Sequence, residues 1–134
     1  MEDIVQKEKI FTPLAPHRMD NHVHPFAQGW KVGNFVFTGG IAAEDPTTGK
    51  LVEGDIKAQA LRCFETMKAI LEAAGSSMDK VVKVTVFFVN FADKAEFEKV
   101  YGEYFPVDRP ARTSVTVTKI GHGALMEIDA IAYV

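Results

Sequence analysis

The chain has 134 residues, of which 47% are hydrophobic and 25% are charged, and its formal net charge is −3. This composition is typical of a globular protein, and we expect one domain, 1–134, that buries a core. Acidic and basic residues are mixed without a basic stripe, so we expect no nucleic-acid partner. We expect no membrane span and no signal peptide, because no apolar run is long enough and residues 1–10 are mostly polar.

The first quarter of the chain begins with a segment of little regularity. Residues 1–24 contain three of the four histidines, and we expect them to form an irregular N-terminal segment. Two strands are predicted at 28–32 and 35–38. They are joined at Gly33-Asn34, two residues that accept the positive φ of a tight hairpin.

The middle of the chain predicts two helices around one strand. A helix is expected from about Asp55 to Ala74, because apolar residues recur there at spacings of three and four. Asp55 suits its N-terminal end and Gly75 its C-terminal end. A strand follows at 81–89, with one face formed by Val82, Val84, Val86 and Phe88. A second helix is expected over 94–104, and Pro106 and Pro110 prevent it from continuing.

The last quarter contains two runs that alternate with period two, at 109–118 and 125–132, as half-buried strands do. In the second run Glu127 and Asp129 point away from an apolar face formed by Met126, Ile128, Ala130 and Ala132. We expect the two strands to be neighbours, with Arg112 and Glu127 on their non-core faces. A guanidinium beside a carboxylate could hold a small carboxylate ligand next to a proton-transfer group.

The order hairpin, helix, strand, helix, hairpin predicts an α+β sandwich of two layers, with both helices on one face of a mixed sheet. The other sheet face would carry the apolar residues Phe87, Val89, Leu125, Ile131 and Tyr133. An exposed apolar patch of this extent usually marks an interface. We therefore expect a homo-oligomer, with polar groups at the interface margin as candidates for a ligand site.

Six segments of the chain form a recognisable series in this order: 33–40, 72–75, 81–87, 101–106, 109–112 and 127–132. Through these segments the chain resembles the Rid family, also called YjgF or reactive-intermediate deaminases, from about Pro25 to Val134. The resemblance implies a chorismate-mutase-like homotrimer with pockets in the clefts between subunits. It also implies hydrolysis of small 2-imino or enamine carboxylates (2-iminobutanoate, 2-iminopropanoate, aminoacrylate-like compounds) to 2-keto acids and ammonia, without a metal or organic cofactor.

Two residues carry the chemistry that the resemblance implies. Arg112 matches the family arginine that binds the substrate carboxylate, and Glu127 matches the glutamate that positions or activates water. A planar guanidinium can hold a carboxylate through two parallel hydrogen bonds. One carboxyl group near both water and nitrogen can then move the protons that imine hydrolysis requires.

Other positions of the family pocket are matched less completely. Thr38 and Gly39 match a backbone segment that lines the pocket, and Ser114 falls where deaminating members often have cysteine. Phe26 stands where many members have tyrosine, and Gly40 where glutamine is common. These departures leave the substrate identity open.

Other interpretations remain open from the residues themselves. Arg112 could be only an ion-pair partner and Glu127 only a solvated carboxylate, with Asp129 as the structural partner of an arginine or a backbone group. The chain could also be a non-catalytic carboxylate binder or a chaperone-like trimer. A ribonuclease, an activity attached to some family members, is disfavoured by the acidic balance and by the lack of a catalytic histidine pair.

Three further residue groups have simple interpretations. His22-Val23-His24 has a spacing that metals can use, but it lacks acidic or cysteine companions in a matching motif, so we expect no metal site. Cys63 is expected to be a buried apolar residue, and the lack of a second cysteine favours the reducing cytoplasm. His122 is expected to be solvated in a loop, or to reach the pocket of a neighbouring subunit.

Overall fold

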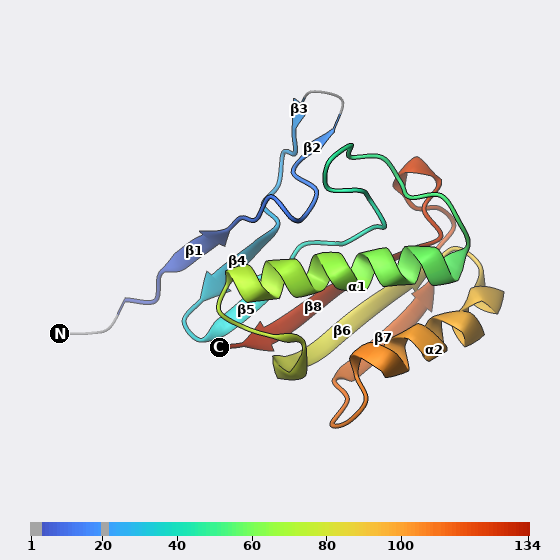
Figure 1. Cartoon of the computed structure of the whole chain (residues 1–134). Helices are drawn as coiled ribbons and strands as arrows, with labels where there is room; N and C mark the ends of the chain where they lie inside the picture. The colour runs from blue at the N-terminus through green and yellow to red at the C-terminus, as the bar shows by residue number, and fades with distance from the viewer. Residues whose placement is uncertain (1–3, 20–21) are drawn as a thin grey trace.

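The computed structural model describes residues 4–19 and 22–134. Within these ranges the two α-helices are α1 (Ile56–Ala73) and α2 (Lys94–Tyr104), and the main strands are β1 (Lys7–Ile10), β4 (Gly29–Val32), β5 (Phe35–Thr38), β6 (Val81–Phe88), β7 (Ala111–Thr116) and β8 (Met126–Tyr133). The strands form one mixed sheet in the order β1-β4-β5-β8-β6-β7, and both helices lie on the same face of it (Figure 1). The predicted α+β fold is confirmed.

Shorter elements complete the described chain. A two-stranded pair, β2 (Arg18–Met19) and β3 (His22–Val23), lies apart from the main sheet (Figure 1). Single 3-10 turns occur at η1 (Met78–Lys80), η2 (Phe91–Asp93) and η3 (Gly121–Gly123). No helix within the described ranges is long and apolar enough to cross a membrane.

Helix α1 begins and ends where its sequence predicts. The side chain of Asp55 accepts a hydrogen bond of 3.1 Å from the backbone N–H of Ala58, which satisfies a donor that the first helical turn leaves free. Gly75, just beyond the helix, has a φ of +83°, a conformation that favours glycine. The buried face of α1 packs on the sheet and on α2.

Aromatic side chains join the two helices to the sheet. The ring of Phe64 on α1 lies 5.9 Å from that of Phe97 on α2, and Phe97 meets Phe88 of β6 edge to face at 5.0 Å. These three side chains are almost completely buried. The remaining members of this cluster are Tyr101, Tyr104 and Phe105.

The last two strands are not neighbours, contrary to the prediction. β6 lies between β7 and β8, parallel to β7 and antiparallel to β8. The reason is the crossover through α2, which returns the chain to the sheet in the direction of β6. The register of β6 also shifts between Val81 and Lys83, so Val81 is buried and Val82 is 42% exposed, the reverse of the expected faces.

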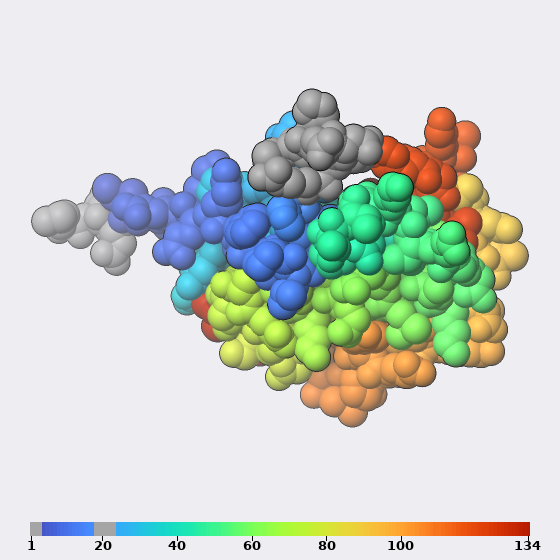
Figure 2. Space-filling model, turned by 45° about the horizontal axis from the view of Figure 1, so that its top comes forward, coloured from blue at the N-terminus to red at the C-terminus, as the bar shows by residue number. Residues whose placement is uncertain are grey.

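The N-terminal segment is more regular than expected. β1 pairs with β4 along its whole length and forms an edge of the sheet. Figure 2 shows this blue segment extending away from the body of the fold. The ammonium group of Lys7 lies 4.1 Å from the ring centroid of Trp30 on β4, a cation–π contact that helps to hold the exposed strand.

The helix-free face of the sheet exposes large apolar side chains. Phe35 is 52% exposed, Phe37 41%, Val115 39% and Tyr133 42%. Phe35 is paired with Tyr133, and both lie opposite the face that carries the buried Val36. Leu125, expected on this face, packs against the core instead. The apolar character of the face is as predicted, and the homotrimer that would cover it stays a prediction.

Replacing Phe64 by alanine should lower the free energy of unfolding by about 3–5 kcal/mol, because it removes the ring that joins the helices and leaves a cavity. Urea denaturation followed by circular dichroism measures this change. Phe91→Ala, at a ring that is 66% exposed, is the control and should stay within about 0.5 kcal/mol. Equal losses in the two variants would contradict the packing described.

Candidate functional site

Glu127 lies where the sheet opens between two strands. β5 pairs with β8 only from Phe35 to Phe37, after which the chain turns away through Gly39. Thr38 stabilises this separation, since its hydroxyl accepts a 3.0 Å hydrogen bond from the backbone N–H of Ala130 and donates one of 2.9 Å to the carbonyl of Gly39. The side chain of Thr38 is therefore engaged in the scaffold, and Gly39 lines the hollow beside Glu127.

The absence of a side chain at Gly40 leaves room for the carboxyl group of Glu127. A Cβ atom at Gly40 would lie 3.0 Å from Cδ of Glu127 and 3.1 Å from its Oε2. The carboxyl group borders a cavity of about 90 Å³, to which Phe26 and Glu44 also contribute. A small molecule or a water can therefore approach this carboxyl group.

The surroundings of Glu127 favour its protonated form. Burial raises the pKa of Glu127 above its ordinary value, and the negative charges of Asp129 and Glu44 add to this effect. A carboxyl group with a raised pKa gives and takes protons more easily near neutral pH. This property suits the proton-transfer role expected of Glu127.

His24 and Glu44 also line this cavity, and the sequence analysis did not predict either of them as a neighbour of Glu127. Nε2 of His24 lies 4.0 Å from Oε2 of Glu44, and both side chains are largely buried. The ring of His24 also lies 4.8 Å from that of Phe26. His24 had been considered only for its metal-like spacing, and no pattern marks Glu44, which lies in the loop after Ile41.

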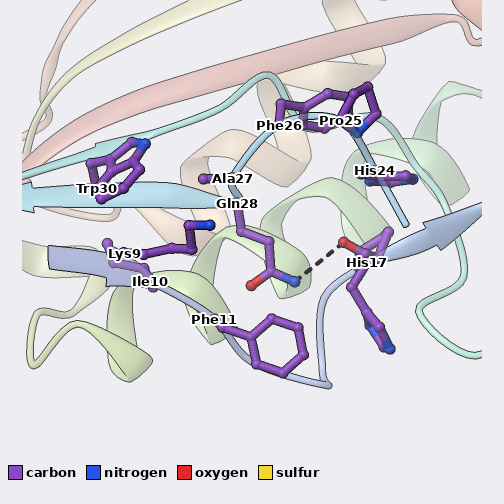
Figure 3. Close-up of a pocket in the computed structure, with 11 residues that line it drawn as sticks. Lys9, Ile10, Phe11, His17, His24, Pro25, Phe26, Ala27, Gln28 and Trp30 are labelled. Atoms are coloured by element: carbon purple, nitrogen blue, oxygen red, sulfur yellow. Dashed lines mark hydrogen bonds between the residues drawn. The ribbon is translucent and has the colours of Figure 1, made fainter. Parts of the chain in front are cut away.

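A larger hollow of about 640 Å³ adjoins this cavity through shared wall residues (Figure 3). Figure 3 shows Phe11 and Phe26 on opposite sides of it, with Gln28 between them. Gln28 donates hydrogen bonds to the carbonyls of Thr12 and Pro16, at 3.0 and 3.2 Å. Gln28 therefore fixes the N-terminal segment against the site, and the exposed Phe26 stands at the boundary of both spaces.

Arg112 lies in a different environment from Glu127. Residues in register on neighbouring strands point to the same face of the sheet. Arg112 is in register with Val84, which faces the helices, and Val84 is in turn in register with Ala130. Glu127 is in register with Phe87, which points to the other face. The expectation that both groups share the non-core faces of adjacent strands is wrong for a single chain. The alternation predicted the wrong face for Arg112 because Val115, an apolar residue of the edge strand, points to the helix-free face and not to the core.

The guanidinium of Arg112 already binds a carboxylate. Its two terminal nitrogens donate to the two carboxylate oxygens of Glu98 on α2, at 3.0 and 2.5 Å. Its Cζ also lies 4.6 Å from the ring centroid of Tyr101. Glu98, and not the Asp129 considered earlier, is therefore the ion-pair partner of Arg112. The separation of 14 residues between a helix and a strand gave no signal in the sequence.

Three other residues singled out in the sequence are Ser114, Asp129 and Cys63. Ser114 lies on the same face of β7 as Arg112, and its buried hydroxyl has no hydrogen-bond partner among the described residues. Asp129 is in register with Thr85 of β6, and burial raises the pKa of Asp129. Cys63 is buried, as expected, and burial raises the pKa of its thiol far above the usual range.

The histidines considered for other roles have different outcomes. The side chains of His22 and Val23 lie outside the described part of the chain, so the expectation that His22-Val23-His24 holds no metal stays a prediction. Among the described residues, no group of three or more His, Cys, Asp or Glu side chains could hold a metal ion. His122 is exposed in η3 with a φ of +60°, and its reach to a neighbouring subunit stays a prediction.

The chain matches a known family model over residues 17–134, described as Endoribonuclease L-PSP. A RutC family protein of Pyrococcus abyssi is 47% identical over 127 residues, covering 95% of this chain and 97% of that protein. The chain belongs to this family, whose members also carry the name Rid. A Dermatophagoides farinae relative, named 2-iminobutanoate/2-iminopropanoate deaminase, is 37% identical over 96% of this chain and 97% of its own length.

Several solved structures have the same fold as this chain. A putative endoribonuclease from Thermotoga maritima superimposes with a TM-score of 0.89 at 40% identity, over 96% of this chain and 98% of that chain. TdcF of E. coli, crystallised with bound serine, gives a TM-score of 0.87 at 34% identity, over 95% and 98% of the two chains. A Rid-family protein from Yersinia pestis also gives 0.89, at 34% identity over 96% and 100% of the two chains.

Replacing Glu127 by glutamine should stabilise the folded protein at neutral pH and have no such effect near about pH 3. The folded-state pKa of Glu127 is raised above its ordinary value of 4.5. Ionisation of this carboxyl group therefore opposes folding. The resulting loss of folding free energy grows as the pH rises from the ordinary pKa of 4.5 to the raised pKa of the folded state. Chemical denaturation at several pH values measures the difference between the variant and the wild type.

The matched control for this experiment is Glu96→Gln, at an exposed carboxylate that pairs with Lys99 at 2.8 Å. It should show no gain in stability at neutral pH. If Glu127→Gln is less stable than the wild type at neutral pH while the two are equal in acid, the raised pKa of Glu127 is contradicted.

Proposed function

We propose that this Rid-family protein is a deaminase that hydrolyses small 2-imino or enamine carboxylates to 2-keto acids and ammonia, and 2-iminobutanoate and 2-iminopropanoate are the test substrates. The main structural support is the fork of Arg112, which binds a carboxylate, that of Glu98, through two parallel hydrogen bonds. The relative named for this activity supports the same reaction class. The serine bound to TdcF, an amino acid with a carboxylate, supports a ligand of this kind.

The reaction needs a held carboxylate and a movable proton. Arg112 would hold the substrate carboxylate and thereby fix the position of the imine carbon. Glu127 would direct a water molecule to that carbon and pass one of the two water protons to the nitrogen, which gives a carbinolamine. The proton of the new hydroxyl group then moves through Glu127 to the same nitrogen. The carbon–nitrogen bond then breaks, ammonia leaves, and the oxygen of water becomes the keto oxygen. This chemistry requires no nucleophilic side chain.

The two groups would meet only across a boundary between chains. Within one chain Arg112 and Glu127 lie on opposite faces of the sheet, so a common site needs a second copy. We propose a homotrimer in which exposed rings such as Phe37 and Tyr133 are covered and the sites lie between subunits. Gly39, Phe26 and the backbone of Ser114 would line these sites. With its single, buried cysteine, the protein would act in the cytoplasm.

Arg112→Ala should lower the rate of ammonia release by about 100-fold or more, because the substrate is no longer oriented. Glu127→Gln should lower it by a similar factor, about 100-fold, through loss of proton transfer. The measurement is a coupled ammonia assay with 2-iminobutanoate generated in situ. Lys99→Ala removes an exposed cation of α2 and is the control, with an unchanged rate expected.

Ammonia release by Arg112→Ala at the wild-type rate would contradict the proposed function. Ligand binding without turnover of any imino acid in a panel would instead indicate a non-catalytic binder or a chaperone-like trimer. RNA should be tested in the same preparations, since the family model bears the name of a ribonuclease. With a net charge of −3, we expect no cleavage that depends on Arg112 or Glu127.

A further inference from the structure

The ion pair between Arg112 and Glu98 closes the guanidinium fork. Both terminal nitrogens of Arg112 are engaged by the two oxygens of Glu98. The pair lies at the sheet edge, where the side chain of Arg112 is 21% exposed and that of Glu98 is 38% exposed. The pair is therefore accessible to a solute, and water screens the attraction that holds it together.

Arg112 is supported independently of Glu98. Its guanidinium carbon lies 4.6 Å from the ring centroid of Tyr101 and 5.8 Å from that of Phe97. Contacts with two rings hold the guanidinium in place through dispersion and cation–π attraction. The fork would therefore keep its position if the carboxylate of Glu98 moved away.

The carboxylate of Glu98 is attracted to Arg112, and it also borders a hollow into which it can turn. The hydrogen bonds from Arg112 lower the pKa of its carboxyl group, and the charges of Lys94 and Arg109 act in the same direction. A hollow of about 440 Å³ adjoins Glu98, and Lys94 lies in its wall. A carboxylate that leaves Arg112 can thus turn towards a second cation without losing all of its electrostatic stabilisation.

We propose that Glu98 is an internal carboxylate that competes with the substrate for Arg112, and so sets the affinity of the protein for small acids. This proposal rests on the proposed function, in which Arg112 binds the substrate carboxylate. The two N–H groups that face Glu98 cannot serve two carboxylates in the same geometry. Each binding event must therefore displace Glu98, and the free energy of the ion pair is subtracted from that of binding.

The test compares Glu98→Gln with Glu96→Gln, an exposed carboxylate on the same helix whose partner is Lys99. In Glu98→Gln the KM for 2-iminobutanoate should fall by roughly three- to tenfold, the range of a partly exposed, bidentate ion pair. The value of kcat should change by less than about twofold, because Glu98 makes no contact specific to the transition state. The dissociation constant of 2-oxobutanoate, measured by titration calorimetry, should fall with KM. Glu96→Gln should leave all three values unchanged.

An unchanged or higher KM in Glu98→Gln, in a variant whose oligomeric state and circular dichroism match the wild type, would overturn the role of Glu98. If activity in that case still depends on Arg112, the proposed deaminase stands and only this inference fails. If Arg112→Ala is fully active, the proposed function fails first.

A second measurement uses the wild-type protein and does not depend on the folding of a variant. In a crystal structure with 2-oxobutanoate, the ligand carboxylate should occupy the fork of Arg112, and Glu98 should have turned away. A ligand that binds while both hydrogen bonds between Arg112 and Glu98 remain would overturn the competition.

Discussion

The alternation of side chains along β8 is the constraint on which the rest of the structure depends. Ile128 and its neighbours two residues away, Met126 and Ala130, are buried beneath the helices, so Glu127 and Asp129 must point to the other side. β8 is paired on both edges, with β5 and β6. A slip of one residue would bury two carboxylates and expose the apolar row, at a high cost in free energy. Core packing therefore fixes the position of the carboxyl group that we assign to proton transfer.

The same rule on β7 separates the two charged groups. Arg112 is in register with Val84 and points to the same side of the sheet, towards α2, where Glu98 neutralises its charge. Glu127 lies in a cavity that disfavours its ionised form. One chain thus carries, on opposite sheet faces, the guanidinium to which we assign substrate binding and the carboxyl group to which we assign proton transfer. Their cooperation requires a second copy, for which the exposed apolar side chains of the helix-free face offer a surface.

Local periodicity predicted much of this fold, and non-local pairing accounts for the failures. Helices α1 and α2 and the faces of β8 follow from spacing and from end signals such as Asp55. β1 has the sequence KEKI, which shows no apolar alternation, and it is a strand only because β4 offers a free edge. The place of β7 beside β6, and the contact between Arg112 and Glu98, depend on how α2 returns to the sheet. The identities of Arg112 and Glu127 were visible in the sequence, whereas their separation was not.

Mixed oligomers test most directly whether Arg112 and Glu127 act together across a boundary between chains. Arg112→Ala and Glu127→Gln subunits, carrying different affinity tags, would be co-expressed, purified as mixed trimers and assayed for ammonia release from 2-iminobutanoate. Neither parent has a complete site, but each mixed trimer should hold both intact groups at one of its three intersubunit sites, so about a third of the sites should be restored, with activity in proportion. Mixed trimers no more active than either parent would show that the two groups do not complete each other's sites, and would contradict the account.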